Sequence, residues 1–113
     1  MKDLKRYAFL IAIGLLIFSG TGCYKKEAIP TADFSFSRND SIVPDTVTFH
    51  NLSTNADSYK WDFGDNTTSS ATNPVHIYTD TATTTYSIVL KSYSKSGEQW
   101  AIKTRNLFIQ HKR

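Results

Sequence analysis

The stretch Ser58-Tyr59-Lys60-Trp61-Asp62-Phe63-Gly64-Asp65-Asn66 decides how this chain folds. Aromatic and polar residues alternate in it, so a strand here would place Tyr59, Trp61 and Phe63 on one face. The three residues that follow Phe63 tolerate turns and positive φ, and they end the strand. We therefore predict a strand over residues 58–63, with Trp61 packed in the core.

Further strands are expected on both sides of this stretch. The alternation of apolar and polar residues predicts them over residues 32–37, 47–51, 75–78 and 86–93, with one or two closing strands over 99–109. Turn-forming residues separate these short segments, and no helical periodicity is present. The pattern predicts an all-β, two-sheet sandwich.

Three sequence blocks occur in an order that resembles the PKD domain (polycystic kidney disease repeat). They are Tyr-x-Trp-Asp-Phe-Gly-Asp at 59–65, Asn-Pro-x-His-x-Tyr at 73–78 and Tyr-x-Ile-x-Leu at 86–90. The resemblance covers residues 32 to 109 and implies an immunoglobulin-like fold. It also implies a set of structural motif residues, namely Tyr59, Trp61, Asp62, Phe63, Gly64, Asp65, Pro74, His76, Tyr78 and Tyr86. Domains of this family generally belong to extracellular and cell-surface proteins, and the family does not fix a reaction.

Residues 1–22 have the pattern of a targeting segment. Basic residues at positions 2, 5 and 6 precede an uncharged, largely aliphatic run at 7–18 and small residues at 19–22. The single cysteine, Cys23, follows directly and resembles the acylated cysteine of bacterial lipoproteins, although Gly20 replaces the usual aliphatic residue. We predict a cleaved lipoprotein signal peptide and membrane attachment through acyl chains on Cys23. The alternatives are an ordinary signal peptide or an uncleaved anchor.

The organisation of the mature chain follows from this cleavage. We expect a lipidated tether at 23–31, a single domain at 32–110 and a solvated tail at 111–113. An Asp directly after the acylated cysteine resembles the signal that retains some lipoproteins in the inner membrane. This chain has Tyr24 at that position, so we predict the outer membrane. Whether the domain faces the periplasm or the cell surface stays open, because Glu27 is the only acidic residue of the tether.

Charge excludes one class of partner. The chain has a formal net charge of +3, but removal of the signal takes away three basic residues and one acidic one, leaving +1. No basic stripe is interleaved with aromatic residues, so we expect no nucleic-acid binding.

The sequence favours a protein that is not an enzyme. It has no phosphate-binding glycine loop and no evident nucleophile–base pair, and its one cysteine is assigned to the lipid. Asp62 and Asp65 could form a catalytic or cation-binding pair, but turn hydrogen bonds are the preferred interpretation. His50, His76 and His111 lie on separate segments, so we predict no metal and no cofactor.

A calcium site is the alternative to the prediction that the chain binds no metal. Some collagenase-type PKD domains bind calcium near the first strand, and Asp33, Asp40 and Asp45 are the residues that could assemble such a site here. Their spacing is not a calcium motif.

Two functions of different classes remain. The first is a lipid-anchored module that contacts or spaces a protein partner at the outer membrane. The second is a polysaccharide-binding module that presents Tyr93 and Trp100 as a stacking strip, with Tyr78 as an optional third member. Trp100 is expected either as an exposed edge aromatic or as packed against Tyr93. Three coplanar exposed aromatics would favour sugar, and a compact apolar patch would favour protein.

Three Asp-Ser/Thr-aliphatic triplets resemble acceptors of bacterial O-linked glycans. Their hydroxyls belong to Ser41, Thr46 and Thr81, which we expect in or beside loops. Chance occurrence in a Ser- and Thr-rich chain is the competing interpretation.

Overall fold

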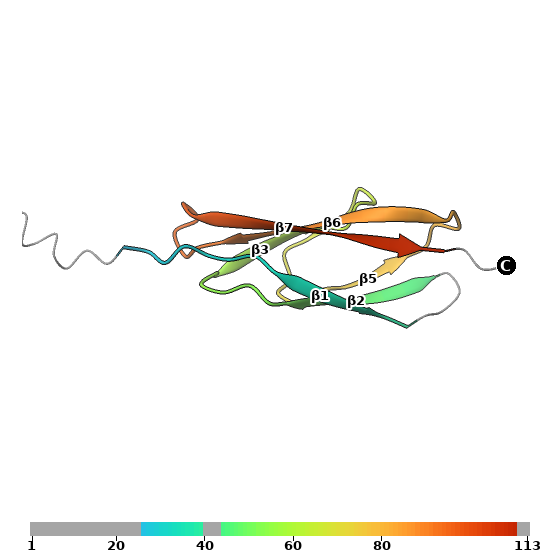
Figure 1. The fold of residues 1–113 in the computed structure, drawn as a ribbon, viewed down its shortest axis with the longest axis horizontal. Coiled ribbons are helices and arrows are strands. Elements are labelled where there is room, and N and C mark those ends of the chain that lie inside the picture. The colour runs from blue at the N-terminus through green and yellow to red at the C-terminus, as the bar shows by residue number, and fades with distance from the viewer. Residues whose placement is uncertain (1–25, 40–43, 111–113) are drawn as a thin grey trace, which may run out of the picture.

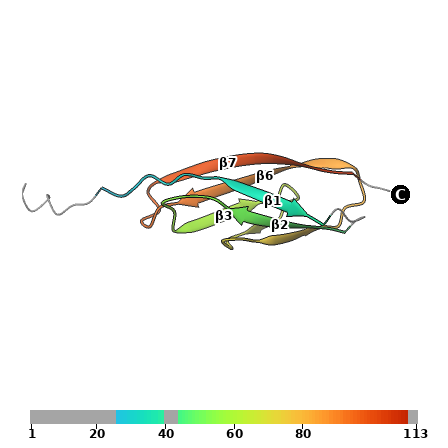
Figure 2. The ribbon, with the colours of Figure 1, turned by 60° about the horizontal axis from the view of Figure 1, so that its bottom comes forward.

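The computed structural model describes residues 26–39 and 44–110. It is an all-β sandwich of two antiparallel sheets that lie face to face (Figures 1 and 2). The smaller sheet has the order β1-β2-β5, and the larger one the order β4-β3-β6-β7. The strands are β1 (Phe34–Arg38), β2 (Asp45–Asn51), β3 (Ser58–Asp62), β4 (Thr68–Ser69), β5 (Val75–Tyr78), β6 (Thr84–Tyr93) and β7 (Trp100–Ile109).

The core lies between the two sheets because each strand turns its apolar positions inward. Strand β6 alternates strictly, with Tyr86, Ile88 and Leu90 buried. Trp61 is fully buried at the centre, 5.1 Å from the ring of Phe34 and 5.4 Å from that of Phe49. Edge-to-face and tilted aromatic pairs of this kind stabilise a core beyond the area that they bury.

The strands differ from the sequence predictions at several ends: β1 spans Phe34–Arg38, β3 ends at Asp62, and β6 begins at Thr84. Strand β2 begins at Asp45, two residues earlier than expected, and residues 99–109 give one closing strand that starts at Trp100. Strand β4 was not predicted, because two residues are too short to show an alternating pattern.

Two arginines connect the sheets along the edge where β1 and β7 lie side by side (Figure 1). The Arg38 guanidinium donates to the Phe108 carbonyl oxygen at 2.8 Å and to the buried Asp45 carboxylate. The Arg105 guanidinium donates to the Phe34 carbonyl oxygen at 2.8 Å and to Asp33 at 3.1 Å. These contacts satisfy backbone groups of two edge strands that would otherwise be open to pairing with another chain.

Part of the segment expected to be a tether packs on the sandwich. Thr31 forms a β-bridge with Thr54, and its backbone N–H donates to the Thr54 carbonyl oxygen at 2.9 Å. Glu27 accepts hydrogen bonds from the turn between β6 and β7. The ordered contacts of the domain therefore begin before residue 32. Within the described ranges, no helix is long and apolar enough to cross a membrane.

Candidate functional site

The motif residues shared with the PKD pattern hold the fold together. Trp61 donates its indole N–H to the Ala71 carbonyl oxygen at 2.8 Å, and Tyr78 donates its hydroxyl to the Phe63 carbonyl oxygen at 2.8 Å. The Phe49 backbone N–H donates to the Pro74 carbonyl oxygen at 2.9 Å. Tyr59 is partly buried and packs on the edge of the core. These contacts tie loops to strands.

Asp65 and His76 form a hydrogen-bonded pair under the turn after β3. Their side chains meet at 2.7 Å, and the His76 ring stacks on Phe63 with 4.2 Å between ring centres. Partial burial opposes ionisation of Asp65, but hydrogen bonds from Thr67 and His76 outweigh it and hold the pKa of Asp65 below its usual value. Asp62 accepts from the Gly64 backbone N–H at 2.9 Å. The two carboxylates thus organise their own turn.

The Asp65–His76 pair lacks the geometry of a nucleophile–base relay. Thr67 offers a hydroxyl 3.3 Å from His76 Nε2, but the same nitrogen contacts Asp65. A relay needs one ring nitrogen for the nucleophile and the other for the orienting carboxylate. The cluster therefore supports a structural role.

Gly64 is required by the same turn. Its φ is +79°, and a Cβ at this position would lie 2.8 Å from the backbone oxygen of Ser87. Only glycine combines this left-handed conformation with such a close approach.

The stacking strip proposed for polysaccharide binding is wrong in one member. Tyr78 is only 1% exposed, and burial raises the pKa of its hydroxyl far above the usual value. It faces the core because residues 76 and 78 share the inward side of β5. Three coplanar exposed aromatics are therefore not available from Tyr78, Tyr93 and Trp100.

The aspartates considered for calcium are held apart. Asp33 precedes β1 and pairs with Arg105, whereas Asp45 is buried against Arg38 at the other end of β1. Asp40 lies outside the described residues. No group of three metal-ligating side chains occurs within residues 26–39 and 44–110.

Several other predicted positions are now placed. His50 is exposed, and it lies on the outward side of β2, away from the inward-facing His76. Thr81 is exposed in the β5–β6 connection, as expected for a glycan acceptor, but Thr46 lies within β2 and pairs with Ile77. Cys23, Ser41 and His111 fall outside the described residues.

The outer face of the larger sheet carries the strongest candidate for ligand contact. Tyr93 pairs with Trp100 across β6 and β7, and in the next outward row Lys60 pairs with Lys91, which pairs with Ile102. Trp100 is 52% exposed and Ile102 is 50% exposed. We call the set Lys60, Lys91, Tyr93, Trp100 and Ile102 the outer-face patch.

Lys91 organises the aromatic part of this patch. Its ammonium lies 4.2 Å from the centre of the Trp100 ring and 5.2 Å from that of Tyr93. Both distances fall within cation–π range. Trp100 is thus exposed, in agreement with the first of the two sequence alternatives, and it shares the Lys91 ammonium with Tyr93.

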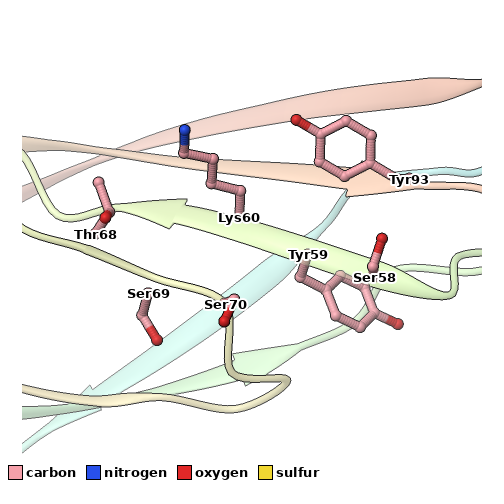
Figure 3. A pocket seen from close by; sticks show the side chains of 7 residues that line it. All are labelled: Ser58, Tyr59, Lys60, Thr68, Ser69, Ser70 and Tyr93. Atoms are coloured by element: carbon pink, nitrogen blue, oxygen red, sulfur yellow. The ribbon is translucent and has the colours of Figure 1, made fainter. Parts of the chain in front are cut away.

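A shallow hollow adjoins the patch along β3 and β4. Figure 3 shows Lys60 and Tyr93 on one side of β3, with Tyr59 turned to the other. The hollow is lined by Ser58, Tyr59, Lys60, Thr68, Ser69, Ser70 and Tyr93. Hydroxyl groups, one ammonium and an aromatic edge can bind polar or anionic groups of a partner beside the apolar contact of Trp100 and Ile102.

Sequence reasoning found Tyr93 and Trp100 but missed the other members of the patch. Ile102 and Lys91 were undetected because the outward side of β6 and β7 depends on the pairing register. Glu27 was considered only as a charge of the tether, and its hydrogen bonds to the domain were not predicted. A single acidic residue in a polar segment has no pattern that distinguishes a hydrogen-bonded side chain from a solvated one.

Comparison with known proteins identifies the family. The PKD domain family matches residues 27–109. Collagenase ColA of Bacillus cereus is 32% identical over 81 residues, which cover 67% of this chain. The match spans only 8% of the collagenase.

Solved structures agree with this fold. The PKD1 domain of Vibrio anguillarum Epp superposes with a TM-score of 0.63 at 25% identity, covering 77% of this chain and all of that domain. The PKD1 domain of the Vibrio cholerae metalloprotease PrtV gives a TM-score of 0.60 at 24% identity, covering 74% of this chain and 99% of that one.

A third structure comes from work on the promiscuous specificity of carbohydrate-binding modules of the β-sandwich superfamily. It gives a TM-score of 0.63 at 25% identity and covers 77% of this chain and 36% of that one. The aromatic core, the Gly64 turn and the match over residues 27–109 together show that this chain belongs to the PKD domain family.

Proposed function

We propose that the protein is a non-catalytic, lipid-anchored module of the bacterial outer membrane that contacts a protein partner through the outer-face patch. The anchor rests on the basic, aliphatic and small-residue segments that precede Cys23. The domain itself is a PKD accessory module of the type found in secreted proteases and a collagenase. Its function then lies in contact and spacing.

The composition of the patch is the observation that carries the protein-contact proposal. Trp100 and Ile102 expose apolar surface side by side, and Lys91 lies over the Trp100 ring. A tryptophan and a tyrosine next to an exposed aliphatic residue are typical of a protein-binding centre. A compact patch of this kind favours protein over an extended sugar strip.

The polar clusters of the described residues have structural partners. Asp65 and His76 are engaged with each other and with Phe63, while Asp33 and Asp45 are paired with arginines. None of these clusters in the described residues aligns a hydroxyl or thiol with a free base. The proposal therefore assigns no reaction to this chain.

Polysaccharide binding is the second candidate. It is favoured by the exposed indole of Trp100 and by the likeness to a structure studied for carbohydrate-binding modules. With Tyr78 buried, such a site would use Tyr93 and Trp100 alone and bind a short segment of sugar chain.

A pull-down of the lipidated protein from its native membrane separates the two candidates. The patch variant combines Trp100→Ala with Ile102→Ser. The matched control combines Val75→Ser with Ile77→Ser, which are similarly exposed on the outer face of the smaller sheet. We expect a protein that is recovered with the wild type and the control but lost with the patch variant, as identified by mass spectrometry.

Two results would overturn the proposal. Equal recovery of every protein with the patch variant would remove the patch as a contact surface. Retention of the wild type, but not the patch variant, on polysaccharide from the host envelope would replace the protein partner with a sugar.

A further inference from the structure

The chain that leads towards Cys23 is fixed to one end of the sandwich by Glu27. The Ser96 backbone N–H donates to Glu27 Oε1 at 2.8 Å, and the Ser94 hydroxyl donates to Oε2 at 2.9 Å. The Ser96 hydroxyl donates to the same Oε2. Hydrogen bonds from the Ser96 hydroxyl and backbone hold the pKa of Glu27 below its usual value, so the carboxylate is the form that is bound.

The turn that binds Glu27 is itself well defined. The Ser94 backbone N–H donates to the Gln99 carbonyl oxygen at 2.9 Å, and the Gly97 N–H donates to the Ser94 carbonyl oxygen at 3.0 Å. Ser94 is buried, and its hydroxyl also accepts from the Gln99 N–H at 3.2 Å. Glu27 is therefore hydrogen-bonded to a turn between β6 and β7 that has its own internal hydrogen bonds.

These contacts limit how far the domain can lie from an anchor at Cys23. Cys23 lies four positions before Glu27, so an extended chain between them spans at most about 14 Å. Without these contacts, the free chain would extend to the β-bridge of Thr31, eight residues from Cys23 and about twice as far. Glu27 thus halves the length over which the domain can move away from its anchor.

The outer-face patch begins at the same end. Tyr93 is the last residue of β6 and Trp100 the first of β7, directly on either side of the turn that Glu27 binds. The opposite ends of these strands, Thr84 and Ile109, lie about 30 Å further along. Figure 1 shows the described chain entering at the β6–β7 turn and β7 ending at the other end of the sandwich.

We propose that Glu27 is a clamp that holds the outer-face patch beside the lipid headgroups, so that its partner is a protein embedded in or attached to the same membrane. This inference rests on the proposed function, because it requires the acyl anchor at Cys23. A patch this close to the membrane surface would contact the membrane-proximal part of a neighbouring protein. A soluble partner would instead meet the far end of the sandwich more readily.

Energy transfer from tryptophan to a dansyl-headgroup phospholipid measures this orientation. The lipidated protein is reconstituted into vesicles of phosphatidylethanolamine and phosphatidylglycerol that contain the labelled lipid. Trp61 is buried and common to all samples, and a Trp100→Phe variant gives its contribution. A second donor variant adds Phe108→Trp to Trp100→Phe, which moves the exposed indole eight residues along the same face of β7.

We expect strong transfer from Trp100 and clearly weaker transfer from tryptophan at position 108, which lies about 26 Å further from the turn. Glu27→Ala should reduce this difference, because the longer free chain lets the domain tilt and rise. Equal transfer from the two positions in the protein with Glu27 would overturn the clamp. Lipidation is checked in the same samples by intact mass, so loss of the anchor is distinguished from loss of the orientation.

A crosslinking experiment in the native host tests the partner. A photoreactive amino acid replaces Ile102, and a flexible six-residue Gly-Ser insertion between Lys25 and Lys26 serves as the comparison, because it lengthens the free chain without altering the patch. We expect a crosslink to a membrane protein that becomes several-fold weaker with the insertion. A crosslink to a soluble protein, or one that the insertion leaves unchanged, would contradict a partner in the same membrane.

Discussion

Replacement of Trp61 by alanine tests the core assignment most severely. Trp61 is fully buried and contacts the rings of Phe34 and Phe49, and its indole N–H is bonded to the Ala71 carbonyl oxygen. Truncation of a buried tryptophan costs about 3–5 kcal/mol, because apolar contacts are lost and a cavity remains. Ala71 is exposed, so water can donate to its carbonyl oxygen in the variant. Loss of the indole hydrogen bond should therefore add little to this cost.

The loss is large relative to the stability of so small a domain. A free energy of unfolding near the lower end of about 5–15 kcal/mol is expected, since the chain is short and has no disulfide. At about 4–8 °C per kcal/mol, a loss of about 3–5 kcal/mol should lower the melting temperature by about 12–40 °C. Little folded protein should remain at 37 °C.

The assay is urea and thermal unfolding of the mature chain with Cys23→Ser, followed by circular dichroism. Trp100→Ala is the matched control, because it removes the same side chain from an exposed site and should cost about 1 kcal/mol or less. A Trp61→Ala protein that melts like the wild type would refute the core assignment. Equal losses for Trp61→Ala and Trp100→Ala would show that the sheet face around Trp100 is also buried.

Three further perturbations address the turn and the aspartates. Gly64→Ala should cost more than about 2 kcal/mol, because the alanine would be strained at φ +79° and would collide with the Ser87 backbone; Gly97→Ala, with the same sign of φ and open space around it, should cost clearly less in the same melt. The pKa of Asp65 is lowered, so its ionised carboxylate stabilises the folded state above pH 3.8, and this contribution should disappear as the pH falls through the folded-state pKa. In an acid titration of stability, Asp65→Asn should lack this component. Calcium at about 10 mM, which exceeds the dissociation constants of extracellular calcium modules, should leave the melting temperature unchanged, and a rise of several degrees would indicate a site that includes Asp33 or Asp45.

The sequence was sufficient for the parts of this structure that depend on local alternation. Trp61, Phe63 and Ile88 could be assigned to the core because their strands alternate over several residues and end in turn-forming residues. The block around Gly64 indicated the family because its glycine and aspartates meet requirements of one tight turn.

Features that depend on long-range pairing could not be predicted in this way. The sequence left Tyr78 either as a structural motif residue or as an optional member of the exposed strip, and the pairing of β5 with β2 decides that it faces the core. Asp45 pairs with an arginine of a neighbouring strand, Asp33 pairs with Arg105 of β7, and the contacts of Glu27 join residues 67 or more positions apart. The sequence contains no local signal for such contacts.

Both the proposed function and the proposed orientation of the patch depend on an acyl anchor at Cys23, so direct measurement of this anchor is the central test. Intact mass spectrometry of the protein purified from the membranes of its native host should give a chain that begins at Cys23 and carries acyl chains. Cys23→Ser should abolish the added mass and the membrane attachment. Hexose-sized increments that disappear with Thr81→Ala would add a glycan to this account. A mature chain that lacks acyl mass, or a Cys23→Ser protein that stays in the membrane with unchanged mass, would contradict it.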